Sequence, residues 1–179
     1  VVELPSTFPY LPLGDFAFAA WVNSDNVGVA GQRIFCNDQN NTSNGYSLSL
    51  GDPGGGRIRF YMRNVSPVSL DMTNATFYLT SNTWYHVAMV HNAASNTRSI
   101  YINGELAASG TYTGSPSGVA DGLAGIGGEV AASSESSNRF DGEIDEVSIW
   151  QTALSQTEIR NLMCAKLIGI ETNLLAYYR

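Results

Sequence analysis

The sequence predicts an all-β fold, in which two antiparallel sheets pack face to face as a jelly-roll sandwich with one short C-terminal helix. Many short apolar runs recur at roughly 8–12-residue spacing, and Asn, Gly and Pro turn signals separate them. The helical period appears only once, late in the chain, at residues 155–163. We see neither an internal repeat nor a linker in the 179 residues, so we expect a single domain spanning residues 1–179.

Two runs are apolar on both faces and are therefore predicted to be central strands, at residues 15–23 and 84–91. The dipeptide Asn103-Gly104 predicts a tight hairpin turn. The remaining expected strands are shorter or alternate in polarity, and they span residues 1–4, 33–36, 46–50, 57–63, 99–102, 105–108, 123–128, 140–150 and 173–178. Three long polar segments, residues 37–44, 111–121 and 131–139, are predicted to be loops.

Residues 140–159 join a strand with one wet face directly to the helix. Ser155 is the expected N-cap of that helix, and Glu158 stands three residues later, at the spacing of a capping box. Ile159 and Leu162 would then share one helix face and should be buried against the sandwich. We expect the helix to lock the β-structure.

The composition excludes some partners. The chain carries a formal net charge of −7, and Lys166 is its single lysine, so it has no basic stripe that could neutralise phosphates; we expect no nucleic-acid partner. No window contains 18 apolar residues, which predicts no membrane insertion. Cys36 and Cys164 could pair or remain free. Because the first residues, VVELP, resemble the middle of a strand, we expect the chain to be excised from a larger multimodular protein whose other modules are its neighbours.

Six segments together resemble the LamG-like jelly-roll family, a branch of the concanavalin A-like lectin/glucanase superfamily that also includes the pentraxins. They are FAFAAWV at 16–22, NGYSLSL at 44–50, NTWYHVAMVHN at 82–92, SIYINGEL at 99–106, AGIGGE at 124–129 and FDGEIDEVSIWQTALSQTEI at 140–159. The segments occur in the family's order and cover most of the chain. The resemblance implies a secreted, extracellular or cell-surface module that recognises sugars, proteins or matrix, often with calcium.

Two places could hold that calcium, which requires oxygen ligands. The first is a loop rim, where resemblance to the pentraxins points to Asp38 or Asn41 with Glu129, and where Asn40 and Glu135 complete the candidate ligand-binding residues. This chain departs from the pentraxin pattern after Glu129, because Val130-Ala131 stand where further oxygen ligands would be expected. The second place is Asp145, which resembles a structural calcium ligand of related sandwich enzymes. The alternative for both is a solvated loop or a turn-forming Asx residue.

The segment Glu143-Ile144-Asp145-Glu146 resembles the acidic strand of laminarinases and lichenases, in which carboxylates alternate along one strand. Retaining hydrolysis needs two carboxyl groups about 5–5.5 Å apart on one face. Alternation would place Glu143, Asp145 and position 147 on the same face, but residue 147 is a valine and residue 148 a serine. Since the third acid is missing, we expect no enzymatic activity.

The function expected from these observations is carbohydrate recognition. Aromatic rings can stack on sugar rings, and the candidates for this role are Tyr61, Tyr78 and Tyr112. The loop rim formed by residues 37–44, 131–139 and 111–121 is the expected location, with an open sheet face as the alternative. A structural or adhesive spacer without a small ligand, or an adhesion module for an extracellular or cell-surface protein, is the competing interpretation.

Overall fold

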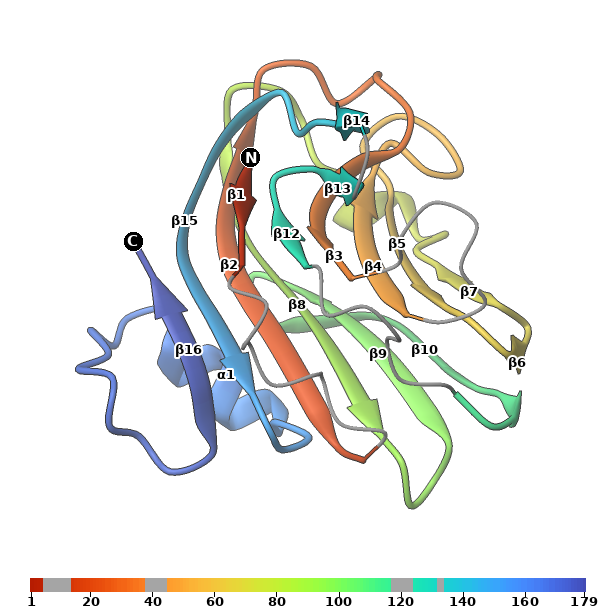
Figure 1. The fold of residues 1–179 in the computed structure, drawn as a ribbon, viewed down its shortest axis with the longest axis vertical. Helices are drawn as coiled ribbons and strands as arrows, with labels where there is room; N and C mark the ends of the chain where they lie inside the picture. The colour runs from red at the N-terminus through yellow and green to blue at the C-terminus, as the bar shows by residue number, and fades with distance from the viewer. Residues whose placement is uncertain (5–13, 38–44, 117–123, 132–133) are drawn as a thin grey trace.

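The computed structural model describes residues 1–4, 14–37, 45–116, 124–131 and 134–179, and the side chains of residues 131–137 are outside the description. Two six-stranded antiparallel sheets pack face to face, and a short helix lies against the outside of one of them (Figure 1). The predicted two-sheet jelly-roll sandwich with one short C-terminal helix is confirmed.

We call the two large sheets A and B. Sheet A has the strand order β1 (Val2–Glu3), β12 (Gly125–Ile126), β3 (Gln32–Cys36), β4 (Tyr46–Leu50), β5 (Ile58–Met62) and β7 (Ser69–Asp71). Sheet B has the order β10 (Glu105–Thr111), β9 (Thr97–Ile102), β8 (Trp84–Asn92), β2 (Phe16–Ser24), β15 (Gly142–Trp150) and β16 (Leu174–Tyr178). Two small ribbons pair β6 (Val65–Ser66) with β11 (Thr113–Gly114), and β13 (Glu129–Ala131) with β14 (Ser134–Ser137). A 3-10 turn, η1 (Ala75–Phe77), precedes β8.

The main hydrophobic core lies between the two sheets, because alternate residues of each strand point inward. Strand β2 lies between β8 and β15 in sheet B, and it is buried along almost its whole length, as its two-sided apolar pattern predicted. Phe16 packs edge-on against Tyr46 of the opposite sheet, with ring centroids 4.7 Å apart. Such aromatic pairs across the interface bury large apolar areas and hold the two sheets together.

A second, smaller core lies on the outer face of sheet B, under helix α1 (Gln156–Leu162). Its members are apolar side chains of β2, β8, β15 and the C-terminal segment: Ala17, Ala19, Ala88, Val90, Trp150, Leu154, Ile159 and Leu167. The predicted capping box is present, since Ser155 accepts a hydrogen bond from the Glu158 amide while the Glu158 carboxylate accepts one from the Ser155 amide. Ile159 is fully buried as predicted, but Leu162 is only half-buried, because it lies at the last turn and at the margin of this core.

The strand β15 departs from simple alternation. Its pairing with β2 slips between Asp145 and Ser148, so that Asp145 faces Trp21 and Ser148 faces Ala19. Glu146 at this bulge has a positive φ of 51°. Val147 therefore points into the core, and the prediction that position 147 shares a face with Glu143 and Asp145 was wrong. Ser148 takes that position.

Residues 131–139 were predicted to form a loop, whereas their described backbone contributes to the β13–β14 hairpin. Cys36 is buried in β3 and Cys164 is exposed after α1, and the two do not form a disulfide. Among the helices of the described ranges, none has the length and apolar character needed to cross a membrane.

Candidate functional site

The outer face of sheet A carries a continuous row of polar side chains, which we call the polar row. Along β4, Leu48 faces the core and Ser49 belongs to the outer face, where its side chain is fully buried; along β5, Phe60 faces the core and Arg59 faces outward. The strand register places Arg33, Ser49, Arg59 and Asp71 opposite one another on four neighbouring strands. Adjacent strands lie about 4.8 Å apart, so the row extends across about 15 Å of the sheet.

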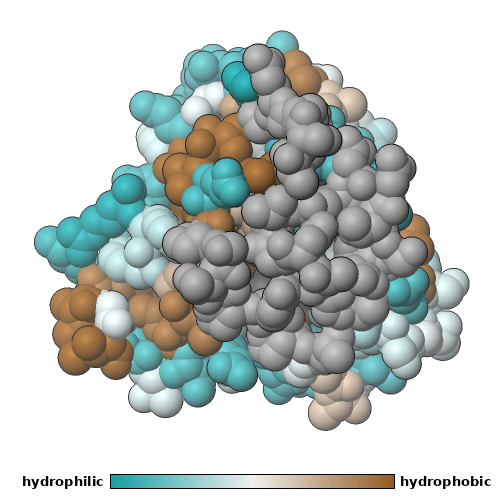
Figure 2. Space-filling view, viewed as in Figure 1, coloured by the Kyte–Doolittle hydropathy of each residue, from teal (hydrophilic) through white to brown (hydrophobic). Residues whose placement is uncertain are grey.

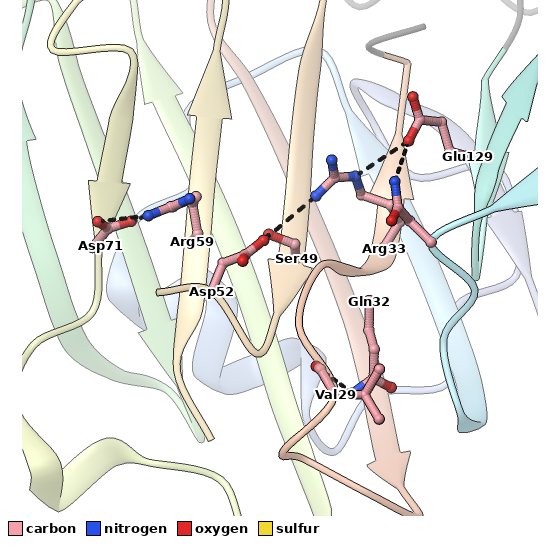
Figure 3. A network of polar contacts seen from close by, with 9 residues as sticks. Val29, Gln32, Arg33, Ser49, Asp52, Arg59, Asp71 and Glu129 are labelled. Carbon is pink, nitrogen blue, oxygen red and sulfur yellow. Dashed lines mark hydrogen bonds and ion pairs between the residues drawn. The ribbon is translucent and has the colours of Figure 1, made fainter. Parts of the chain in front are cut away.

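One end of the polar row is a two-pronged ion pair. The Arg59 guanidinium donates from Nε to Asp71 Oδ1 at 2.6 Å and from Nη2 to Asp71 Oδ2 at 3.1 Å (Figure 3). This hydrogen bonding to Asp71 raises the pKa of Arg59 above its ordinary value. Both side chains remain partly exposed, so their outer edges are available to a ligand while their orientation is fixed.

The other end of the row surrounds Arg33, which lies between two carboxylates (Figure 3). Its Nη1 is 3.7 Å from Asp52 Oδ2, and its Nε is 4.0 Å from Glu129 Oε2. Ser49 Oγ donates to Asp52 Oδ2 at 3.3 Å, and Asn138 Nδ2 donates to Glu129 Oε2 at 2.6 Å. Strand β3, the turn after β4, and the β13 region therefore meet at one arginine.

Two buried polar atoms of this face have no hydrogen-bond partner within the described residues: Arg33 Nε and Ser47 Oγ. Ser47 belongs to a second outward row, in which the register aligns it with Cys36 on one side and Tyr61 on the other. Buried donors without partners are costly and are normally satisfied by protein, water or ligand. This face therefore has hydrogen-bonding capacity that the described part of the protein does not use.

The three aromatic candidates differ in their availability. Tyr61 is half-buried on the outer face of sheet A, with the Arg63 guanidinium 5.0 Å from its ring centroid. Tyr78 lies under Arg57 and donates its hydroxyl to the Thr73 carbonyl. Tyr112 is only 5% exposed and is therefore excluded as a stacking surface. Its hydroxyl is 2.7 Å from His91 Nε2.

The predicted loop rim is only partly inside the described structure. Asp38, Asn40 and Asn41 lie outside the described residues, and Glu135 lies on β14 with its side chain outside the description. Glu129 is buried, and its carboxylate already contacts Arg33 and Asn138. The structure thus places Glu129 at the end of the polar row.

The second predicted metal ligand, Asp145, is exposed on the outer face of sheet B, so the two candidate places belong to different sheets. Its Oδ1 accepts a hydrogen bond from the Glu146 amide. Within the described ranges, no group of three or more His, Cys, Asp or Glu side chains is arranged to hold a metal ion. A calcium ion at Glu129 would compete with the Arg33 cation, and its expected co-ligands Asp38 and Asn41 lie outside the described residues, so calcium binding at Glu129 stays a prediction.

Sequence reasoning missed most of the polar row: Arg33, Ser49, Asp52, Arg59 and Asp71. The alternation of residues 57–63 does place the arginines outward, and that signal was visible in the sequence. Their carboxylate partners could not be assigned from it, because the Arg59–Asp71 pair depends on the register between β5 and β7.

Comparison with known proteins supports this architecture. Residues 1–160 match the sequence model of the family described as the concanavalin A-like lectin/glucanases superfamily. No curated protein sequence matches the chain.

Three similar solved structures show the same fold at low sequence identity. A proposed carbohydrate-binding protein from Bacteroides ovatus ATCC 8483 superposes with a TM-score of 0.71 at 19% identity, over 97% of this chain and 46% of that one. A heptameric SAP-like pentraxin from Limulus polyphemus has a TM-score of 0.65 at 16% identity, over 89% and 73% of the two chains. The CBM40 of a Ruminococcus gnavus IT-sialidase, bound to α2,3-sialyllactose, has a TM-score of 0.67 at 14% identity, over 85% and 84%. The chain spans less than half of the Bacteroides protein, and it belongs to the concanavalin A-like lectin/glucanases superfamily.

Proposed function

We propose that this chain is a non-catalytic carbohydrate-binding module, and that it binds a neutral glycan on the outer face of sheet A. The observation that carries the proposal is the polar row, in which guanidinium donors and carboxylate acceptors alternate across neighbouring strands. Sugar hydroxyls both donate and accept, so alternating groups of this kind match them. Because the ion pairs already fix these side chains, a ligand would order few of them on binding.

The charge of the row favours neutral sugars over acidic ones. Three carboxylates, those of Asp52, Asp71 and Glu129, face the two guanidinium groups of Arg33 and Arg59. A sialic or uronic acid would have to displace a carboxylate from its arginine and would meet the remaining carboxylates at short range. Neutral hexose or pentose units carry no such penalty.

Tyr61 supplies an apolar surface in the adjacent outward row. The Arg63 guanidinium lies over one face of this ring, which restricts the ring's orientation, so a stacked sugar would use the other face. A pyranose ring stacked on the exposed part of Tyr61 would bring its hydroxyls toward Arg59 and Asp71, the partly exposed end of the polar row. The proposed site therefore combines one aromatic contact with several directional hydrogen bonds, as small-ligand sites commonly do.

Absence of catalysis belongs to the same proposal. The acidic residues of β15 lie on sheet B, and Ser148 follows Asp145 on their shared face where a third acid would be needed. The Glu146 carboxylate accepts a hydrogen bond from the Tyr177 hydroxyl. Cleavage of β-glucans that disappears in Glu143→Gln would refute a non-catalytic module.

We also propose that the module works outside the cell and that calcium assists it, with Asp38, Asn41 or Asp145 as ligands. Family membership supports both ideas. Asp145 is exposed, so a calcium ion can reach it without displacing a cation. Calcium binds only the folded protein in this proposal, so it should raise the melting temperature above that measured in chelator. Identical melting curves would refute calcium binding.

The binding proposal is tested on a glycan array with the wild-type chain and two variants. Arg59→Ala and Asp71→Ala each leave one partner of the two-pronged ion pair unmatched, so both should weaken binding of neutral glycans. Arg57→Ala is the matched control, because Arg57 contacts Tyr78 rather than the polar row. Exclusive binding of sialylated glycans would contradict the charge argument, and no binding to any glycan or matrix protein would favour a structural or adhesive spacer.

A further inference from the structure

The interior of the sandwich contains a buried arginine. Arg98, in β9 of sheet B, is only 1% exposed. Burial lowers its pKa from 12.5 to about 10, so the guanidinium is still charged at neutral pH. Within the described residues, no carboxylate forms an ion pair with Arg98, and its Nε has no hydrogen-bond partner. A buried charge without an ion pair is costly, so the contacts that Arg98 does make have to offset this cost.

The contacts of Arg98 connect the two sheets. Its Nη1 donates to the Val68 carbonyl at 2.9 Å, and its Nη2 donates to the Pro67 carbonyl at 2.7 Å. These two carbonyls lie directly before β7, the last strand of sheet A. The guanidinium also lies 5.8 Å from the ring centroid of Phe60 in β5 and 5.6 Å from that of Tyr112, which follows β10. Arg98 therefore holds the start of β7 from the opposite sheet.

Strand β7 has few other contacts that fix its position. It is three residues long, it forms an edge of sheet A, and it pairs with β5 alone. All three of its side chains are partly exposed, and of these Leu70 packs against the main core. In Figure 2 the right side of the molecule, where Figure 1 places β6 and β7, is mostly hydrophilic or neutral surface. A short edge strand that buries so little apolar surface has a weakly specified register.

The register of β7 determines one end of the polar row. It places Asp71 opposite Arg59, where the two side chains form the two-pronged ion pair. A slip of one residue would turn the Asp71 side chain to the inner face, and a slip of two would move it about 7 Å along the sheet. The Val68 carbonyl that Arg98 holds also accepts a hydrogen bond from the Met62 amide at 2.8 Å. Arg98 thus acts at the first rung of the β5–β7 ladder.

We infer that Arg98 is a positioning residue for the glycan face, because it fixes the register of β7 and so holds Asp71 opposite Arg59. The guanidinium is buried between the sheets, so it does not touch a ligand on the outer face and acts only through β7. This role in binding rests on the proposed glycan site. The positioning of Asp71 is measured separately, without any glycan.

The first test follows the ion pair by NMR in Arg98→Met, because methionine is long and apolar but donates no hydrogen bond. Arg59 Nε–H donates to Asp71, so its proton resonance reports on the pair directly. In Arg98→Met this resonance should move toward that of a free guanidinium. The amides of Met62 and Met72, which bond to Val68 and Ile58 at the two ends of the ladder, should exchange at least about tenfold faster.

Two further variants separate positioning from general stabilisation. Arg160→Met is the matched control, because Arg160 also donates to a main-chain carbonyl, that of Gly104, but it belongs to α1. It should leave the Arg59 resonance unchanged. Arg98→Lys keeps the charge and can donate to one of the two carbonyls, so it should retain part of the wild-type signal. This variant carries the test if Arg98→Met fails to fold, and melting temperatures establish which variants are folded.

The second test measures affinity for the neutral glycan that the array identifies. Arg98→Met should weaken binding about as much as Asp71→Ala does. Because Arg98 acts through Asp71, the double variant Arg98→Met/Asp71→Ala should bind no more weakly than Asp71→Ala alone. Additive losses would overturn the inference, since they would show that Arg98 affects binding by another route.

The NMR results can overturn the positioning role independently. An unchanged Arg59 resonance and unchanged Met72 exchange in folded Arg98→Met would show that β7 keeps its register without Arg98. Uniformly faster exchange in both sheets would make Arg98 a general stabiliser. A displaced Arg59 resonance supports the positioning role even if the wild-type chain binds no glycan, and that second result would refute the proposed function alone.

Discussion

His86 should make the stability of this protein fall between pH 7 and pH 5. Its side chain is on the outer face of β8, only 2% exposed, and its ring lies 5.5 Å from that of Trp21. Burial lowers the pKa of His86 from 6.5 to about 4. Its Nδ1 is buried and has no hydrogen-bond partner among the described residues, so nothing described compensates a proton placed there.

The sign and size of the effect follow from linkage. Below pH 6.5 the unfolded chain takes up a proton on His86, whereas the folded protein resists protonation down to about pH 4. The contribution of a neutral His86 to folding stability is therefore fully present above pH 6.5 and is lost as the pH falls. The loss amounts to about 2 kcal/mol between pH 7 and pH 5, and about 3 kcal/mol by pH 4. For a domain of this length, about 2 kcal/mol corresponds to a fall of about 4–8 °C in melting temperature.

Urea denaturation at pH 7, 6 and 5 measures this loss, and His86→Phe is the informative variant. Phenylalanine keeps a planar ring beside Trp21 and cannot take up a proton, so the variant should lose about 2 kcal/mol less than wild type over that range. The pKa of His91 is lowered as well, mainly by burial, and His91 remains in both proteins, so the difference isolates His86. Equal pH dependence in the two proteins, or an NMR titration of His86 near pH 6.5, would refute the reasoning.

The remaining predictions concern the helix and the metal. Ile159→Ala should lower the free energy of unfolding by about 2–5 kcal/mol, because Ile159 is fully buried in the second core, whereas Leu162→Ala should lower it by less than about 2 kcal/mol, because Leu162 is half-buried. Urea denaturation measures both changes. A loss below about 0.5 kcal/mol for Ile159→Ala would show that the helix adds nothing to stability. Ser155→Ala should lower the free energy of unfolding by about 1 kcal/mol through loss of the capping box, and Ser155→Asp should retain most of that stability. Equal stability of the two variants would contradict the role of the cap. If Asp145 binds calcium, then Asp145→Asn should abolish the calcium-dependent rise in melting temperature, and a rise unchanged by this substitution would exclude Asp145.

The sequence was informative wherever one strand or one turn decides the structure. The two-sided apolar pattern of residues 15–23 predicted a central strand, and Ser155 with Glu158 predicted the helix start, because both patterns are local. The hairpin at Asn103-Gly104 was predicted for the same reason, and both residues have the positive φ that such a turn requires.

The candidate site could not be predicted in the same way, because it depends on register between strands that are distant in sequence. Arg33 and Glu129 are almost a hundred residues apart along the chain, and the pairing of β3 with β12 in sheet A brings them together. Trp84 is 42% exposed, although residues 84–91 were predicted to form a central strand that is apolar on both faces. Its position at the first residue of β8 leaves one side of the ring without a neighbouring strand to cover it.

The bulge in β15 explains why strict alternation failed there. The inserted residue moves Val147 into the core, where its side chain contributes to the sandwich interior. Sequence patterns give the period of a strand but not the position of an extra residue within it. The apolar residues Ile144, Val147 and Ile149 show the shifted spacing, and only the register with β2 shows where the shift occurs.

The most direct test of the glycan site on sheet A compares one tyrosine variant with one tryptophan variant, on the outer faces of the two sheets. Tyr61 is half-buried on the outer face of sheet A, and Trp84 is an exposed aromatic residue of sheet B, so Tyr61→Ala and Trp84→Ala remove comparable stacking surfaces from different sheets. The measurement is isothermal titration calorimetry with the neutral oligosaccharide that the glycan array identifies. The proposed site predicts that Tyr61→Ala weakens binding at least about fivefold, since stacking on an aromatic ring contributes about 1–3 kcal/mol, and that Trp84→Ala leaves the affinity unchanged. Loss of binding in Trp84→Ala with full affinity in Tyr61→Ala would contradict the account and place the glycan on sheet B.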